Sequence, residues 1–536
     1  MEHEALGEAR AWILGAIGEP LLNYLLPEGA TSEEGGTAGP IEGEFFSAVA
    51  ELRRKLPEDW DEQTQKQAFR SWLLQKGEGD KTVARIVHER TCVDDVESGD
   101  DAVTAALIEV AQNVYPALLI PAEPLPFPAL IQPEVDTAFH AAAYQNGGVF
   151  TRAIARDSGL SSVFTQDSDP IHSQFNYQAN TGHGGALQLA TLPSELLLSA
   201  WRDVRETMGP VGKFIERVMF RWDMLRSALL GNSVDAVAKI AFTGVLLPDG
   251  RAVAFGDGVV RTVTQAERDR VPEGLKGKIS GYSGDGEVVT INYDGDVLLE
   301  YRFPYRLRLS GDLSESWVDS DEMRPPADIN RLALRLRFAL MLSMDSTPRA
   351  QLIQTWVAFD EPPRPGSSIS WSDPRHGAGF TPVRLTSEDV DRWCEWFDIL
   401  NDSRVDKIEL ALSRILRALA ERRDPSDVLV DSVIAWENLF GTKDGEPTFR
   451  ITMCLTKLLK EGLEERVKFR TELGKIYALR SRVVHGSGEL KATDMVKCQE
   501  ALDVAISAIR VLVSRRQDIL DLKDGALRSA ALLLDG

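Results

Sequence analysis

The chain has 536 residues, of which 43% are hydrophobic and 26% charged, and its formal net charge is −22. This length exceeds that of one ordinary domain, and the composition is that of a folded globular protein, which excludes a mainly disordered chain. An acidic surface repels nucleic acids and anionic membranes, so any contact with nucleic acid must use a local site.

The charge is unevenly distributed along the chain. Residues 401–536 contain 23 lysines and arginines against 22 aspartates and glutamates, a net charge of +1, which leaves a net charge of −23 for residues 1–400. The C-terminal quarter is therefore the part of the chain that is least repulsive to a polyanion.

Compartment and cofactors follow from what the sequence lacks. The four cysteines are far apart and form no C-x-x-C pair, so we expect free thiols in a reducing compartment. The sequence begins with acidic residues where a signal peptide is basic, and no apolar run approaches the roughly 20 residues that span a bilayer. We expect a cytoplasmic protein without membrane contact. His172 and His183 match no spacing of metal ligands, so the sequence predicts no metal and no cofactor.

The first region of the chain is predicted to be helical. Apolar residues around Trp12 and Trp72 recur at the spacing of a helix face, which predicts an acidic helical N-terminal region over residues 1–115. Residues 31–39 are rich in Gly and Glu and predict a loop within this region.

A Pro-rich connector is predicted to follow. Residues 116–133 contain six prolines, a density that is incompatible with a helix and predicts an extended segment. A mixed helical region then reaches residue 235. Within it, Ser194 is the expected N-cap of helical structure that continues to about Leu229.

The middle of the chain changes to a strand pattern. Val, Ile and Tyr alternate with polar residues, which predicts a small antiparallel β unit of about five strands over residues 236–312. The glycine cluster at 281–286 lies between predicted strands, so it indicates hairpin turns and not a phosphate-binding loop, which requires a following helix. Residues 313–384 are predicted to form a connector that contains a helix.

A helical bundle is predicted for residues 385–536. Thr386 is the expected N-cap of its first helix, and Gly441 the expected end of a central one. Short connections between successive helices are typical of an antiparallel bundle. The expected later helices cover about 405–419, 426–440, a segment from 448, 464–485 and a segment after the cap Thr493. The predicted fold class is therefore multidomain α+β, mostly α-helical, with a central antiparallel β unit.

One short segment of the bundle combines residues that can carry chemistry. The chain has no H-E-x-x-H, G-x-x-x-x-G-K-[ST] or G-x-S-x-G motif. Arg480, followed after four residues by His485, belongs to a longer pattern. That pattern is Tyr477, Arg480-Ser481, two apolar residues, then His485-Gly486, and upstream stands Ala435-Trp436-Glu437-Asn438-Leu439-Phe440.

In this context the C-terminal part, about residues 385–520, resembles the HEPN superfamily and in particular its Apea-like branch. The resemblance implies a metal-independent endoribonuclease that usually acts as a homodimer, with Arg480 and His485 as its catalytic pair. The usual setting of such proteins is bacterial defence or stress response. The N-terminal regions would then restrain the nuclease or sense a trigger or partner that the sequence does not identify.

The residue types suit this chemistry. RNA supplies its own nucleophile, the 2′-hydroxyl, so the protein needs to move protons and to stabilise negative charge. A histidine titrates near neutral pH and can act as acid or base. A guanidinium can hold a phosphate through two parallel hydrogen bonds.

A second interpretation remains open at this point. Five residues on a regular helix turn through about 500°, so Arg480 and His485 point about 140° apart. Both residue types also favour the last turn of a helix for electrostatic reasons alone. In the alternative, the bundle is a non-catalytic module for dimerisation or docking in an interaction or sensor protein. Glu437 is expected to orient an arginine through an ion pair, Tyr477 to pack in the core, and Ser481 to be a weak hydrogen-bond acceptor beside the arginine.

Overall fold

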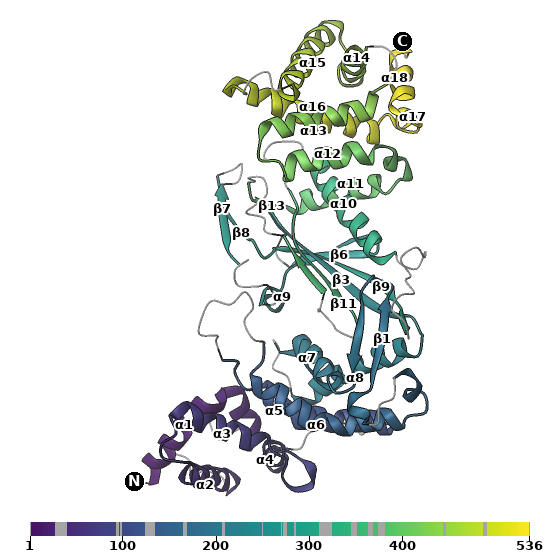
Figure 1. Ribbon diagram of the computed structural model, residues 1–536. Helices are drawn as coiled ribbons and strands as arrows, with labels where there is room; N and C mark the ends of the chain where they lie inside the picture. The colour runs from purple at the N-terminus through teal and green to yellow at the C-terminus, as the bar shows by residue number, and fades with distance from the viewer. Residues whose placement is uncertain are drawn as a thin grey trace.

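The protein is elongated in the computed structural model (Figure 1). Helices form the N-terminal end, an antiparallel sheet with its helices forms the centre, and a helical bundle forms the C-terminal end. The predicted fold class, a mostly helical multidomain α+β protein, is confirmed. The structure describes residues 2–26, 40–92, 96, 99–123, 134–164, 169–205, 210–248, 250–269, 271, 276–282, 286–309, 324–344, 351–362, 368–372, 381–442, 446–485 and 490–534.

The N-terminal end is helical, as predicted. Its helices are α1 (Glu2–Leu25), α2 (Pro40–Lys55), α3 (Glu62–Leu74), α4 (Val83–Thr91) and α5 (Ala102–Leu118). Asp101 caps α5 by accepting hydrogen bonds from the N–H groups of Val103 and Thr104. The predicted loop at 31–39 lies outside the described residues.

Helix α5 corrects the predicted start of the Pro-rich connector. The helix continues through Pro116 to Leu118, although a proline removes one helical hydrogen bond. Most side chains of α5 are buried, and this burial outweighs the single lost hydrogen bond in the last turn. The connector begins after the helix, and residues 124–133 lie outside the described part of the chain.

The next region mixes helices with a hairpin, as predicted. Its elements are α6 (Thr137–Arg156), β1 (Gln174–Ala179), β2 (Gly184–Gln188), α7 (Leu192–Val204) and α8 (Val211–Leu229). The prediction of Ser194 as an N-cap is wrong. Helix α7 begins before Ser194, with Thr191 as its N-cap residue, since Pro193 favours the first turn of a helix. The Ser194 hydroxyl donates to the Thr191 carbonyl oxygen at 2.8 Å.

A six-stranded antiparallel sheet occupies the centre, in the order β12-β11-β3-β9-β6-β5 (Figure 1). Its strands are β3 (Val234–Thr243), β5 (Val253–Phe255), β6 (Gly258–Thr262), β9 (Val297–Tyr305), β11 (Ile353–Asp360) and β12 (Ser368–Trp371). Small sheets add β4 (Val245–Leu246), β7 (Lys278–Tyr282), β8 (Val288–Asn292), β10 (Leu307–Leu309) and β13 (Val383–Arg384).

The β structure extends beyond its predicted limits. The antiparallel character of residues 236–312 is confirmed, but the region has more strands than the five expected. Residues 313–384 are more than a connector with a helix, because β11 pairs with β3 along its length and lies inside the sheet. Strands β7 and β8 pair antiparallel, as the hairpin interpretation of the glycine cluster requires, and residues 283–285 between them lie outside the described residues. This sheet requires strands that are distant in sequence, so a local pattern cannot define its limits.

The two faces of the sheet contact different cores. Ile240 and Phe242 of β3 join the main core, whereas Ala241 between them packs with Leu298 and Trp356 on the other face. This alternation is the period of two that a strand imposes. Helix α10 (Pro325–Ser343) lies close against the main-core face. A Cβ at Gly258 would lie 2.8 Å from terminal methyl carbons of both Leu299 and Leu332, so glycine lets α10 approach this strand without displacing those side chains.

A buried carboxylate ties the short helix α9 (Gln265–Asp269) to the sheet. Glu267 Oε1 lies 2.7 Å from both Lys239 Nζ of β3 and Arg261 Nη2 of β6. The Glu267 side chain is only 7% exposed. Burial alone would raise the pKa of this carboxyl, but Arg261 and Lys239 together hold the pKa far below its usual value.

We expect Glu267→Gln to lower the free energy of unfolding by about 2 kcal/mol at pH 7. Because the pKa is depressed in the folded state, the carboxylate stabilises the fold above the unfolded pKa of about 4.3 and loses this contribution as the pH falls. Thermal unfolding of the wild-type protein and of Glu267→Gln between pH 7 and pH 3 measures how this stabilisation depends on pH. The difference in melting temperature between the wild type and Glu267→Gln should become smaller below pH 4.5. The difference between the wild type and Glu395→Gln, an exposed control, should not change with pH. A difference that stays constant with pH would contradict this role for Glu267.

The predicted C-terminal helical bundle is confirmed. It contains α11 (Ser387–Leu400), η6 (Ser403–Ile408), α12 (Glu409–Ala420), α13 (Pro425–Phe440), α14 (Pro447–Leu459), α15 (Leu463–Val484), α16 (Ala492–Ser514), α17 (Gln517–Leu520) and α18 (Gly525–Leu534). Thr386 caps α11 in a reciprocal capping box with Asp389, and Gly441 ends α13, both as predicted. Thr493 is not a cap, because α16 begins before it and Lys491 takes that position.

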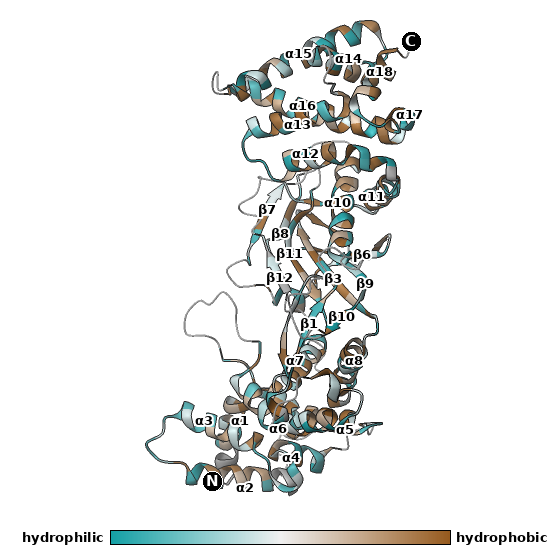
Figure 2. Cartoon of the chain, turned by 45° about the vertical axis from the view of Figure 1, so that its right-hand side comes forward, coloured by the Kyte–Doolittle hydropathy of each residue, from teal (hydrophilic) through white to brown (hydrophobic). Residues whose placement is uncertain are grey.

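The bundle and the centre share one continuous core. Buried apolar side chains form a single cluster from Trp12 to Leu532. At the joint, Phe255 of β5 contacts Trp393 and Phe397 of α11, and Trp393 Nε1 donates to the Leu336 carbonyl oxygen of α10 at 3.0 Å. Figure 2 shows apolar residues continuing through this joint. Among the described residues, no helix has the length and apolar character needed to cross a bilayer.

Candidate functional site

Helix α15 positions every residue of the predicted motif. Leu473, Ile476 and Leu479 are buried and fix one side of the helix against the bundle. Tyr477 and Arg480 lie beside this stripe and are half-buried. His485 follows the last helical residue as the C-cap, and its N–H donates to the Ser481 carbonyl oxygen at 3.1 Å.

The structure brings Glu437, Tyr477 and Arg480 together. The Tyr477 hydroxyl donates to Glu437 Oε1 at 2.6 Å, and Arg480 Nη2 lies 3.7 Å from Glu437 Oε2. Burial and the neighbouring Glu437 carboxylate raise the pKa of the Tyr477 hydroxyl. Glu437 thus lies within ion-pair distance of an arginine. Its partner is Arg480, whereas Arg482 lies 3.4 Å from Asp494 on α16.

Arg480 is held loosely. At 3.7 Å the ion pair with Glu437 is longer than a hydrogen bond, and Arg480 Nε is buried without a hydrogen-bond partner among the described residues. The guanidinium therefore has unused donors, and part of it reaches solvent. Such a group can bind an anion without first breaking a strong bidentate pair.

His485 is exposed, and the structure does not place it beside Arg480. The helix stays regular through Val484, so the expected angle of about 140° between the two side-chain directions remains. Ser481 is also exposed. One protomer therefore presents the arginine towards α13 and the histidine towards solvent. Within one protomer, the pair therefore neither shares an open cleft nor is packed away in the core.

One buried residue stabilises the helix end beside this site, and the sequence gives little sign of it. Arg528 of α18 is buried and donates to the carbonyl oxygens of Leu439 at 2.9 Å and Asn438 at 3.0 Å, in the last turn of α13. It fixes the turn that carries Glu437. The only sequence signal is a single arginine within the apolar segment Gly525–Leu534.

Histidines and cysteines outside the motif lie in different surroundings. His183 Nδ1 lies 2.6 Å from Glu361 Oε1, a contact that pairs the histidine with a carboxylate. Among the described residues, no group of three or more metal-ligating side chains lies together. Burial raises the pKa of the Cys454 thiol to about 12 and that of Cys498 to about 11, which disfavours reactive thiolates there.

Among the described residues, hollows lie within the bundle and at its joint with the centre. One, of about 420 Å³, lies between α15 and α16 with an apolar floor that includes Leu473 and Ile476 and a rim that includes Glu500 and Asp503. Its acidic rim disfavours a polyanion. The other, of about 170 Å³, lies between α10 and α12.

Comparison of this chain with protein-family models, with curated proteins and with solved structures finds no match.

Proposed function

We propose that this protein is a metal-independent endoribonuclease of the HEPN type, in which Arg480 and His485 act on RNA. The observation that carries this proposal is the end of α15. There, an exposed histidine follows a loosely paired arginine, and that arginine is oriented by Glu437 in a bundle whose charge is close to neutral.

The proposed reaction needs no group beyond these side chains and the RNA. The 2′-hydroxyl attacks the adjacent phosphorus while a histidine accepts its proton. The bond to the 5′-oxygen breaks, and this oxygen takes up a proton. The products are a 2′,3′-cyclic phosphate and a 5′-hydroxyl. Arg480 stabilises the additional negative charge on the phosphate as the bond to the nucleophile forms.

A homodimer would solve the geometric problem of the single protomer. Two copies of the α15 end, placed side by side, can direct the histidine of one copy towards the arginine of the other. They also supply two histidines, one to accept and one to donate a proton. Three exposed apolar side chains adjoin this end: Val484 at 51% exposure, Met495 at 52% and Val496 at 60%. Exposed apolar residues that cluster beside a site are typical of interfaces.

Cleavage of RNA in the presence of EDTA tests the proposed activity. We expect the purified full-length protein to cut single-stranded RNA, and the fragments to carry a 2′,3′-cyclic phosphate and a 5′-hydroxyl, identified by mass spectrometry. A matched DNA strand, which lacks the 2′-hydroxyl, stays intact. Cleavage of both strands, or loss of activity in EDTA, would contradict this mechanism.

We expect the protein to be a dimer, with Val496→Glu producing monomers that lose most of their RNA cleavage. A buried unpaired carboxylate at an apolar contact costs more than the few kcal/mol that hold a modest interface together. Light scattering at micromolar concentration measures the mass. Leu230→Glu is the control, since Leu230 has a similar exposure of 51% but lies on the central part. An active wild-type monomer would refute the dimer.

A second function is favoured by two contacts of Glu437. The hydrogen bond from Tyr477 to Glu437 and the ion pair from Glu437 to Arg480 connect α13 and α15 inside the bundle. If this is the only role of these residues, the bundle is a docking or dimerisation module of a sensor protein. In both cases we propose that the acidic regions before residue 385 receive the trigger or the partner.

A further inference from the structure

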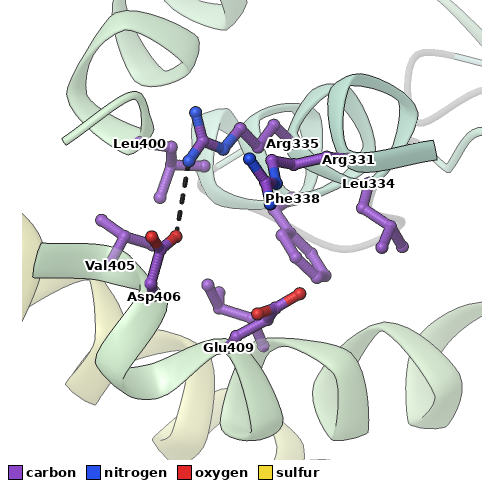
Figure 3. A pocket seen from close by; sticks show the side chains of 9 residues that line it. Arg331, Leu334, Arg335, Phe338, Leu400, Val405, Asp406 and Glu409 are labelled. Carbon is purple, nitrogen blue, oxygen red and sulfur yellow. Dashed lines mark hydrogen bonds and ion pairs between the residues drawn. The ribbon is translucent and has the colours of Figure 1, made fainter. Parts of the chain in front are cut away.

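A cleft of about 170 Å³ lies at the joint between the central part and the bundle (Figure 3). One wall is α10, which presents Arg331 and Arg335. The opposite wall is formed by η6 and α12, which present Asp406 and Glu409. The cleft therefore has two cations on one side and two anions on the other.

Only one of the two possible ion pairs across the cleft is formed. Arg335 Nη2 lies 3.4 Å from Asp406 Oδ1, and Arg335 Nη1 also donates to Asn401 Oδ1 at 2.5 Å. The side chains of Arg331 and Glu409 are exposed and make no hydrogen bond or ion pair with any described residue. The unused charges of the cleft are thus one guanidinium and one carboxylate.

Apolar side chains complete the lining of the cleft. Figure 3 shows the ring of Phe338 extending from α10 towards Glu409, below Arg331. Phe338 and Leu412 are buried and form part of the floor. Arg331 and Arg335 are one helical turn apart, and because Arg335 is already paired with Asp406, Arg331 is the cation that a further anion can approach.

These features define the ligand by its chemistry. It needs an anionic group for Arg331, a cationic group for Glu409 and a small apolar part for the floor. At about 170 Å³ the cleft is smaller than the usual site for a drug-sized ligand, which favours a small molecule over a nucleotide or a peptide. We propose that this cleft binds a free amino acid with an aliphatic side chain. This inference goes beyond the proposed RNA cleavage and does not depend on it.

Binding would have a structural consequence. Arg331 belongs to a helix that packs on the sheet, and Glu409 begins a helix of the bundle. A zwitterion held by both would link the centre to the bundle across the cleft. The ligand would therefore stabilise the joint by mass action.

Titration calorimetry on the full-length protein with alanine, valine, leucine and isoleucine tests this inference. We expect at least one to bind with a Kd below about 1 mM and to raise the melting temperature. The amide of the same amino acid lacks the carboxylate, and its N-acetyl form lacks the ammonium. Each should bind at least about tenfold more weakly, because each leaves one charged partner unpaired.

Two variants locate the site. Arg331→Met and Glu409→Gln should each weaken binding by about 10- to 100-fold, whereas Arg417→Met on the exposed side of α12 should not. No binding of any of the four at about 5 mM would overturn the proposal. Equal binding of the amide and N-acetyl forms, or unchanged binding by both variants, would overturn it as well. The amide and N-acetyl derivatives are measured on the wild-type protein. The proposal can therefore still be tested if a variant fails to fold.

Discussion

His485→Ala is expected to lower RNA cleavage by about 10²–10⁴-fold, the usual contribution of an acid–base group. The fold should not change, because His485 is exposed and follows the last residue of α15. Initial rates on a labelled RNA measure the loss, and circular dichroism measures helicity. His172→Ala, an exposed histidine of the central part, is the control and should cleave at the wild-type rate.

Arg480 should contribute to the same step. Arg480→Lys keeps the charge but loses the planar fork that binds two phosphate oxygens, so it should also reduce cleavage strongly. The double variant should be little slower than the slower single variant, because either change disables the unit. Arg515→Lys, an exposed arginine elsewhere on the bundle, is the matched control. Full cleavage by His485→Ala would place the activity elsewhere, and loss of helicity in both variants would favour a structural pair.

Arg528→Met should have the largest effect on stability, about 3–5 kcal/mol. The buried guanidinium donates to the carbonyl oxygens of Asn438, Leu439 and Leu522. Burial lowers its pKa, yet the positive charge complements the negative end of the α13 dipole. Methionine fills similar space and leaves these carbonyl oxygens without a donor.

Native-state hydrogen exchange of α13 measures this loss. A cost of 3–5 kcal/mol corresponds to protection factors that are about 10²- to 10⁴-fold lower. Arg515→Met removes an exposed arginine and should change stability by less than about 0.5 kcal/mol. Unchanged protection of α13 amides in Arg528→Met would show that the last turn of α13 is stable without this arginine.

Local patterns predicted the helices of the bundle well. Thr386 with Asp389 is a complete capping signal within four residues, and the apolar stripe of α13 repeats along one short segment. The strand β11 lacked such a signal. It becomes a strand because β3, more than a hundred residues earlier, pairs with it, and a local pattern does not contain that partner.

Only the part of the candidate site that lies within one short segment could be predicted from the sequence. The motif placed Arg480 and His485 at the end of one helix, and the expected partner Glu437 lies beside Arg480. The cap by Arg528 and the cleft at Arg331 and Glu409 depend on how separate helices pack. Their residues are far apart in the sequence, so no spacing rule connects them.

The shared aromatic contacts at the joint limit how the two parts can move. Domains joined by a small polar interface usually rotate freely, but Phe255, Trp393 and Phe397 form an apolar contact in which Trp393 is fully buried. A wide swing of the bundle would expose these rings to water, at a cost of about 2 kcal/mol or more for each. A signal that reaches the end of α15 from the acidic regions is therefore better transmitted by small sliding of packed helices than by a hinge that opens.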